Sequence, residues 1–239
     1  MDIPTRLDTE RLIVRKYVEG DGRELFLLLE RNGNREFLRE NVEEASSIKT
    51  EEEAEINVRK HSAEWLARDR FVVGIWLKSE DKCLGQIWIE PKNWEVPSFE
   101  VGWFLDQGYQ GRGIATEAVR RSLEFLFNDF NAHKVIAITR DTNLRSVKLI
   151  ERLGFRREGH LRESGIQDGK RYGLLYYGML RIEFSSGQRA LDCDSSHRSS
   201  IASCLGMATR VSVATHSEIS VDNFSASFSF AASNMKTVS

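Results

Sequence analysis

The sequence predicts an α/β (α+β) fold, in which about four helices cover both faces of a mixed sheet of about seven strands. One observation is the order of the periodic segments, which is β-α-α-β-β-β-α-β-α-β-β. Another is composition, because all five Trp, all five Tyr and all three Pro precede Ser185, whereas the last 55 residues contain 15 Ser. We therefore expect one folded domain at residues 1–184 and a Ser-rich tail at residues 185–239, whose composition favours disorder over a second core.

Net charge and cysteine usage limit the classes of partner. A formal net charge of −2, with many charges of both signs, predicts no field that steers the chain to nucleic acid or an acidic membrane. Cys83, Cys193 and Cys204 suggest neither a disulfide framework nor metal spacing, which favours a reducing cytoplasm. The N-terminal segment is too charged for a signal sequence, and no apolar run approaches the ~20 residues of a membrane helix. We expect a cytoplasmic monomer or homodimer without a metal.

The first third of the chain predicts a strand followed by two helices. In residues 11–17 the apolar Leu12, Val14 and Tyr17 segregate from three charged side chains, as in a half-buried strand. Asp21 is positioned to cap a helix with apolar residues at 25–29, and Thr50 with Glu53 forms a capping box for the next helix. The buried face of that second helix is expected to contain Ala54, Val58, His61 and Trp65.

The central segment predicts a three-stranded meander and a helix. Residues 71–77, 83–90 and 99–105 are rich in β-branched and aromatic side chains, and the polar KSEDK between the first two predicts a hairpin loop. After residues 110–113 the apolar period becomes helical. The expected buried face of this helix consists of Ile114, Ala118, Val119, Leu123 and Leu126.

The end of the domain predicts a strand, a helix and two more strands. Residues 134–139, KVIAIT, contain a continuous apolar run, as a buried strand does. Asn143 is positioned to cap the next helix, and Gly154 to end it. Two further strands are expected around residues 156–166 and 172–182.

A glycine-containing turn between the third meander strand and the following helix is the first candidate for a binding site. Its residues are Gln110, Gly111, Arg112, Gly113, Ile114 and Ala115. Free N–H groups and the positive helix end at such a turn hold a pyrophosphate, and glycine permits close approach. A connection that merely needs glycine also explains the turn by itself. A Rossmann dinucleotide site is set aside, because only the two glycines match the opening of G-x-G-x-x-G and the preceding strands form a meander.

Longer segments resemble the GNAT superfamily of acetyltransferases. QGRGIATEAVRRSLEFLF, from Gln110, is similar to its acetyl-CoA motif Q/R-x-x-G-x-G/A, and DTNLRSVKLIERLGFRREG, from Asp141, is similar to its second cofactor motif. Residues 9–15 resemble the T-E-R-L-x-L-R opening of the RimJ/RimL-like branch, the ribosomal-protein N-terminal acetyltransferase type. Residues 177–180 resemble the final strand of that branch. The matches keep the family order over residues 9–184.

The resemblance implies a fold and a reaction. The sheet would be mostly antiparallel, and a bulge would splay one pair of strands so that the pantetheine arm of acetyl-CoA lies between them. The chain would bind acetyl-CoA, without a metal, and transfer the acetyl group to a primary amine by direct attack in a ternary complex. The amine would belong to a protein N-terminus or a small molecule. A non-catalytic CoA-binding module that serves in sensing or scaffolding is the alternative.

The resemblance also implies roles on the strand that precedes the turn. Only a neutral amine attacks, and a free lysine has a pKa of ~10.4, so a base is needed. A carboxylate on this strand often serves in the family, and Glu100 holds that place; a solvated strand carboxylate is the alternative. The donor to the oxyanion would be the backbone N–H of Phe104 or Leu105.

Further cofactor contacts are implied by the second motif and the turn. Asn143 and Ser146 resemble residues that contact pantetheine and protonate the departing thiolate. A helix cap explains Asn143 equally well, and Ser146 could instead bond backbone. The backbone amides of residues 111–115 would hold the pyrophosphate, and Arg112 would add charge-assisted contacts unless it is solvated.

Two segments depart from the branch pattern. Residues 34–50 lack the aromatic-proline character common there, although this segment helps to line the acceptor cleft. Arg171-Tyr172 stands where Arg-Asp is expected before the final strand. The sequence therefore leaves the identity of the acceptor amine open.

Overall fold

The structure is a computed structural model that describes residues 4–41 and 48–185, with only the backbone of residues 39–41. Its helices are α1 (Gly22–Glu30), α2 (Asn34–Asn41), α4 (Glu51–Ala67), α5 (Ile114–Asn128) and α6 (Leu144–Arg152), with short 3₁₀ helices η1 (Arg31–Gly33) and η2 (Gln107–Tyr109). Its strands are β1 (Arg6–Asp8), β2 (Leu12–Lys16), β3 (Phe71–Leu77), β4 (Lys82–Asn93), β5 (Ser98–Leu105), β6 (Lys134–Arg140), β7 (Arg156–Gln167) and β8 (Lys170–Leu180).

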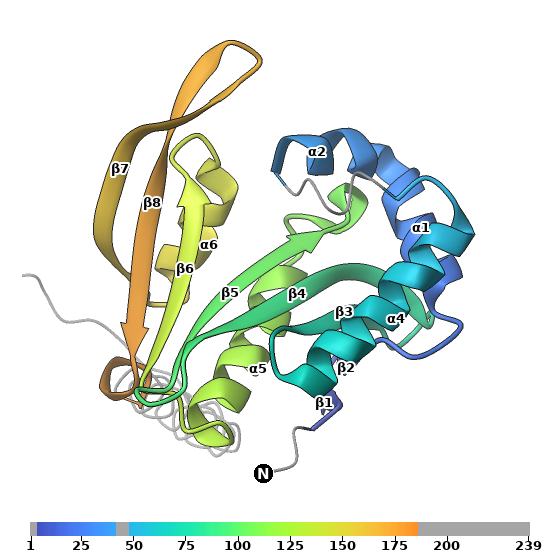
Figure 1. Ribbon diagram of the computed structural model, residues 1–239, viewed down its shortest axis with the longest axis horizontal. Helices are drawn as coiled ribbons and strands as arrows, with labels where there is room; N and C mark the ends of the chain where they lie inside the picture. The colour runs from blue at the N-terminus through green and yellow to red at the C-terminus, as the bar shows by residue number, and fades with distance from the viewer. Residues whose placement is uncertain (1–3, 42–47, 186–239) are drawn as a thin grey trace, which may run out of the picture. The chain divides into compact units, whose positions relative to one another are not determined.

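The strands form one sheet in the order β1-β2-β3-β4-β5-β6-β8-β7. Every neighbouring pair is antiparallel except β5 and β6, which are parallel. That parallel pair is short, since only Ser98–Glu100 lies in register with Lys134–Ile136. Beyond Glu100 the two strands separate, as Figure 1 shows. The expected mixed, mostly antiparallel sheet with a splayed pair is confirmed.

The splay forms without the expected bulge in β5. The ladder between β4 and β5 runs without a break from Phe99 to Leu105, and its register shift lies instead between Pro91 and Asn93. The strands separate because β6 continues its pairing with β8 on its other side while β5 continues with β4. A bulge in β5 is therefore not needed to open the sheet here.

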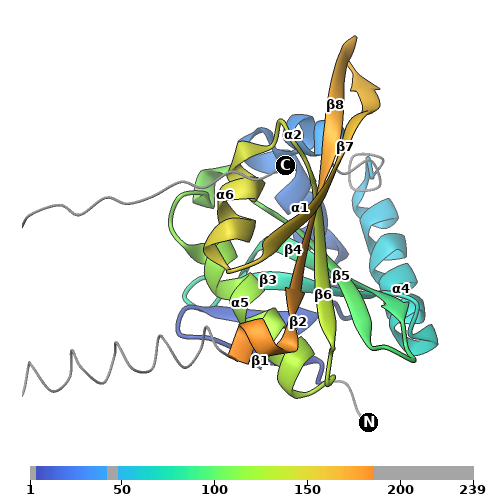
Figure 2. The ribbon, with the colours of Figure 1, turned by 90° about the vertical axis from the view of Figure 1, so that its left-hand side faces the viewer.

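Helices cover both faces of the sheet, as expected (Figure 2). Alternation along β5 sends Phe99, Val101 and Leu105 into a core shared with α5 and α6, whereas Phe104 joins the core under α1 and α4. The expected apolar faces of α4 and α5 are buried. The end of β5 therefore lies between two packed layers.

The capping predictions had different outcomes. Thr50 accepts a hydrogen bond from the Glu53 N–H at 3.1 Å, and the Glu53 carboxylate accepts one from the Thr50 N–H at 3.2 Å, so the capping box is confirmed. Helix α1 begins after Asp21, but the Asp21 side chain makes no cap bond. Its carboxylate instead binds the Arg15 guanidinium at 2.6 Å, and this charge-assisted pair displaces the cap.

Two elements were not expected from the sequence. Strand β1 has three residues, too few to show an alternating pattern, and it is ordered by pairing with β2. Helix α2 lies in the segment left unassigned after α1, and a turn with Asn32 at φ 55° separates the two helices. Only Asn34 and Leu38 of the side chains described in α2 are buried, so its apolar signal is weak.

Aromatic packing extends to the end of the described chain, and the domain limit at residue 184 stays a prediction. Phe184 stacks on Phe127 of α5 with ring centroids 4.7 Å apart. Strand β8 ends at Leu180, two residues before the predicted limit, and residues 181–185 are helical. The predicted tail lies outside the described residues except for Ser185.

A buried carboxylate joins the end of β5 to the turn between α1 and α2. Asp106 is fully buried and accepts hydrogen bonds from Arg31 Nε at 2.8 Å, Asn32 Nδ2 at 2.7 Å and the Gly108 N–H at 2.9 Å. Arg31 also donates to the carbonyl of Cys83 in β4. This cluster holds the N-terminal helices against the strand end that leads into the glycine turn.

Replacing Asp106 with Ala should lower the free energy of unfolding by about 3–5 kcal/mol, because one partner of a buried ion pair is left without the other. Urea denaturation followed by circular dichroism measures this loss. Asp8→Ala is the control, since it also removes an arginine partner but at an exposed pair, and it should have little effect. Equal losses in the two variants would contradict the role assigned to the Asp106 cluster.

Candidate functional site

A cavity of about 640 Å³ lies where β5 ends, between the glycine turn and α6. Every residue that the sequence analysis assigns to the cofactor lines it, with the exception of Arg112. Ser146 lines it as well, whereas Glu100 does not. The cavity is also lined by residues that were not predicted from the sequence, namely Phe37 of α2, Trp103 of β5 and three cations of α6. The resemblance to cofactor motifs therefore identified most of a real cavity, but not its charged wall.

The glycine turn has the conformation of an anion site. Gly111 and Gly113 both have φ of 77°, in the left-handed region that favours glycine. Gly113 is the N-cap of α5 and provides no side-chain cap, so the first N–H groups of the helix have no helical partner. Ile114, Ala115 and Thr116 line the cavity with these groups at the positive end of α5. The turn can therefore bind phosphate through its backbone.

The T-E-R opening of the chain contacts this turn directly. Glu117, in the first turn of α5, accepts hydrogen bonds from the Thr9 hydroxyl at 2.6 Å and from Arg11 Nε at 2.7 Å. Arg11 Nη1 also donates to the carbonyl of Arg112 at 3.1 Å. Burial raises the pKa of Glu117, but the bonds from Thr9 and Arg11 outweigh it and leave the pKa below its ordinary value. The contacts fix the outer side of the turn.

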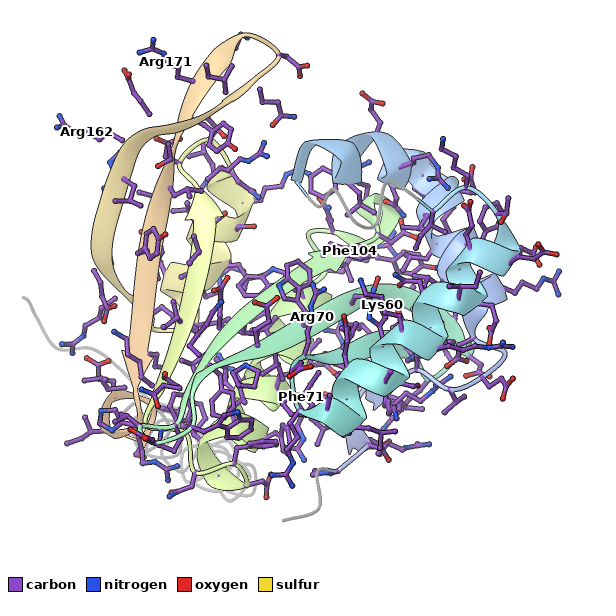
Figure 3. All side chains as sticks on the ribbon, viewed as in Figure 1. Lys60, Arg70, Phe71, Phe104, Arg162 and Arg171 are labelled. Carbon is purple, nitrogen blue, oxygen red and sulfur yellow. The ribbon has the colours of Figure 1, made fainter. Side chains whose placement is uncertain are left out.

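Strand pairing distinguishes the two candidate backbone donors of β5. Gly85 is paired with Leu105, and the Asp106 N–H donates to the Leu84 carbonyl of β4 at 2.7 Å. Since N–H groups alternate sides along an antiparallel strand, the Phe104 N–H also faces β4 and the Leu105 N–H faces the splay. Figure 3 shows Phe104 at the end of β5 near α2. Leu105 is therefore the donor that a ligand in the splay can reach.

Asn143 and Ser146 lie together at the start of α6. The Asn143 side-chain oxygen accepts a hydrogen bond from the Ser146 N–H at 3.2 Å, so the predicted cap is confirmed. The Ser146 hydroxyl makes no hydrogen bond within the part of the chain that the structure describes. The alternative in which that hydroxyl bonds backbone is therefore not observed, and both side chains line the cavity.

Glu100 lies at the point where β5 and β6 part. Its carboxylate, 22% exposed, pairs with Lys92 Nζ at 2.7 Å, and Glu90 shares the same ammonium at 3.2 Å. The Glu100 carboxylate raises the pKa of Lys92, with a smaller contribution from Glu90. Glu100 precedes Leu105 by five residues, or about 16 Å along an extended strand. A proton could pass between the two positions only through water.

Arg112 is placed outside the cavity. Its guanidinium lies over the Tyr109 ring, 5.1 Å from the centroid. Its side chain is exposed, so the solvated alternative describes this structure. Gln110 occupies the cavity side, where its amide donates to the Leu105 carbonyl at 3.2 Å and its oxygen accepts from Arg145 of α6.

The described residues contain neither a membrane-spanning helix nor a cluster of metal ligands. No helix in residues 4–41 or 48–185 is long and apolar enough to cross a membrane. The same ranges contain no group of three or more His, Cys, Asp or Glu side chains that could hold a metal ion.

Comparisons with known proteins give consistent matches. A family model described as an acetyltransferase (GNAT) domain matches residues 11–156. YnaD, an uncharacterized N-acetyltransferase of Bacillus subtilis (strain 168), is 27% identical over 179 residues, which are 75% of this chain and 99% of the relative. The ribosomal-protein-S5-alanine acetyltransferase from Vibrio fischeri has a TM-score of 0.66 at 21% identity, with 76% of this chain and 99% of that chain covered. RimL, a ribosomal L7/L12 alpha-N-protein acetyltransferase solved with coenzyme A, has a TM-score of 0.66 at 17% identity, with 74% and 97% covered.

Proposed function

The chain belongs to the acetyltransferase (GNAT) family, and from this premise we propose that it transfers the acetyl group of acetyl-CoA to a primary amine. The amine attacks directly in a ternary complex and belongs to a protein N-terminus or a small molecule. The observation that carries the proposal is the cavity at the splay, which joins a phosphate-binding turn to a free strand edge. RimL, of the same fold, was solved with coenzyme A.

Different residues of the cavity bind different parts of acetyl-CoA. The amides of residues 113–116 hold the diphosphate, and the free edge of β5 takes the pantetheine arm as an added strand. The Leu105 N–H donates to the thioester oxygen, on which negative charge grows as the amine attacks. Acetyl-CoA itself supplies the activated acyl group. Asn143 and Ser146 contact the arm near its sulfur.

Three protons move in this reaction. The ammonium of the acceptor gives the first to Glu100 through water, which leaves a neutral nitrogen to attack the acetyl carbon. As the C–N bond forms, the nitrogen becomes positively charged and gives the second proton to solvent. The C–S bond then breaks, and the thiolate takes the third proton from the Ser146 hydroxyl, which solvent replenishes. This assignment is supported by the Ser146 hydroxyl, which has no hydrogen-bond partner in the described part of the chain.

Thiol release from acetyl-CoA, measured over a panel of amines and N-terminal peptides, tests the proposed function. An acetyltransferase should release CoA thiol with at least one class of acceptor, and mass spectrometry should find the acetyl group on that acceptor. A protein that binds acetyl-CoA tightly but releases no thiol with any acceptor would instead be the non-catalytic module.

Arg11 should affect cofactor binding more than turnover, because it holds the turn and touches no reacting atom. We expect Arg11→Gln to weaken acetyl-CoA binding roughly 10-fold, since a charge-assisted contact to Glu117 and one to the Arg112 carbonyl are lost. The turnover number at saturation should stay nearly unchanged, which separates loss of binding from loss of chemistry.

Two further variants define the role of Arg11. Arg11→Lys keeps the charge but not the fork that reaches both partners, so it should restore binding only in part. Arg6→Gln removes a cation from the same N-terminal segment without touching the turn, and should leave binding intact. A fall in turnover at unchanged affinity would refute the positioning role.

A further inference from the structure

Helix α6 presents a row of cations to the cavity. Arg145, Lys148 and Arg152 all line it. Their spacing of three and four residues places them on one face of the helix. Figure 1 shows α6 on the β6 side of the opening between β5 and β6. The row therefore forms one wall of the site that begins at the glycine turn.

The charges of this row have no carboxylate partner among residues 4–41 and 48–185. Arg145 donates to the Gln110 side chain, and neither Lys148 nor Arg152 makes an ion pair with any carboxylate of the described residues. The carboxylate of Glu151 in α6 accepts a hydrogen bond from the Tyr177 hydroxyl at 3.1 Å. The cations are exposed, so water solvates them.

This arrangement opposes helix stability. Like charges three and four residues apart repel on a helix surface. Arg145 also lies in the first turn, where the helix dipole disfavours a cation. An anion bound in the cavity would offset both effects.

The glycine turn can bind a diphosphate, but it does not explain the cations further along α6. Arg145 lies beside the turn through its bond to Gln110, and could share a diphosphate held there. Lys148 and Arg152 lie about 4.5 Å and 10.5 Å further along the helix axis. The more distant cations therefore indicate a further anionic group, separate from the diphosphate.

We propose that Lys148 and Arg152 bind the 3′-phosphate of CoA, so that the site selects CoA over 3′-dephospho-CoA. The proposal rests on the proposed function, since it assumes a CoA thioester in this cavity. A phosphate monoester carries about −1.5 to −2 charge at neutral pH and accepts several hydrogen bonds, which suits two flexible cations. The cations of α6 thus select CoA over its dephospho form, and the glycine turn positions the diphosphate.

Calorimetric titration of the full chain with CoA and with 3′-dephospho-CoA tests this selection. The unaltered protein should bind CoA roughly 10-fold more tightly than the dephospho form, a ratio expected for charge-assisted contacts at an exposed site. Lys148→Gln with Arg152→Gln should weaken CoA binding by that factor and leave the affinity for 3′-dephospho-CoA unchanged. Arg162→Gln is the matched control, because it removes an exposed cation of the β7–β8 hairpin, away from the cavity (Figure 3).

Three outcomes would overturn the proposal. Equal affinity of the unaltered protein for the two ligands would show that no residue reads the 3′-phosphate, while leaving the proposed function intact. If the double variant lost affinity for both ligands equally, Lys148 and Arg152 would bind the diphosphate that the two ligands share. Failure of the unaltered protein to bind either ligand would remove the proposed function together with the inference that rests on it.

Discussion

Glu100→Gln is expected to lower the turnover number by roughly 100- to 10,000-fold, the usual contribution of a general base. The substitution keeps the shape of the side chain and removes its ability to take a proton. Acetyl-CoA affinity should hardly change, because Glu100 does not line the cavity. Both quantities are needed, the first from steady-state thiol release and the second from calorimetry.

The pH dependence of the turnover number tests the same variant independently. Raising the pH increases the neutral share of an acceptor amine, so Glu100→Gln should recover part of its activity between pH 6 and 9. Recovery should be strongest for lysine-like amines, whose pKa of ~10.4 leaves them most dependent on a base.

Glu90→Gln is the matched control for Glu100. Both carboxylates share the Lys92 ammonium, so each substitution disturbs the same ion pair. If the base lies at Glu100, Glu90→Gln should keep most of the turnover. Equal losses in the two variants, or unaltered turnover in Glu100→Gln, would make Glu100 a structural partner of Lys92 and leave another group to deprotonate the amine.

Gly113→Val is expected to weaken acetyl-CoA binding by roughly 100-fold. A branched side chain at φ 77° is strained and stands where a phosphate must approach the backbone. Loss of two charge-assisted hydrogen bonds at about 1.5 kcal/mol each corresponds to that factor. Within the protein there is room, since an added Cβ would meet its nearest atom, Arg11 Nη2, at 3.6 Å.

Gly169→Val separates backbone strain from the loss of the ligand site. Gly169 has φ of 74° and would meet no atom within 4 Å of an added Cβ, but it lies between β7 and β8. The two variants should lose similar thermal stability, whereas acetyl-CoA affinity should fall only at position 113. Unchanged affinity in a folded Gly113→Val protein would remove the diphosphate from this turn.

Interactions between neighbours in sequence were predictable. The Thr50–Glu53 capping box, the Asn143 cap and the apolar face of α5 depend on residues within a few positions of each other, so their patterns survive without knowledge of the fold. The left-handed glycines of the turn belong to the same class, because backbone sterics act within one residue. Asp21 shows the limit, since Arg15 competed for the carboxylate that was expected to cap α1.

The sequence by itself determined the family, the order of the main elements and the segment of the glycine turn, because these follow from local periodicity and motif order. Only the tertiary structure decided that Glu100 and Arg112 lie outside the cavity and that three cations of α6 line it. Strand pairing directs the Leu105 N–H to the splay and places Glu100 beside Lys92, and neither property belongs to one segment alone. The bond from Arg11 to Glu117 joins positions 106 residues apart. A contact of that range exists only after the sheet and α5 have packed, so no local pattern could reveal it.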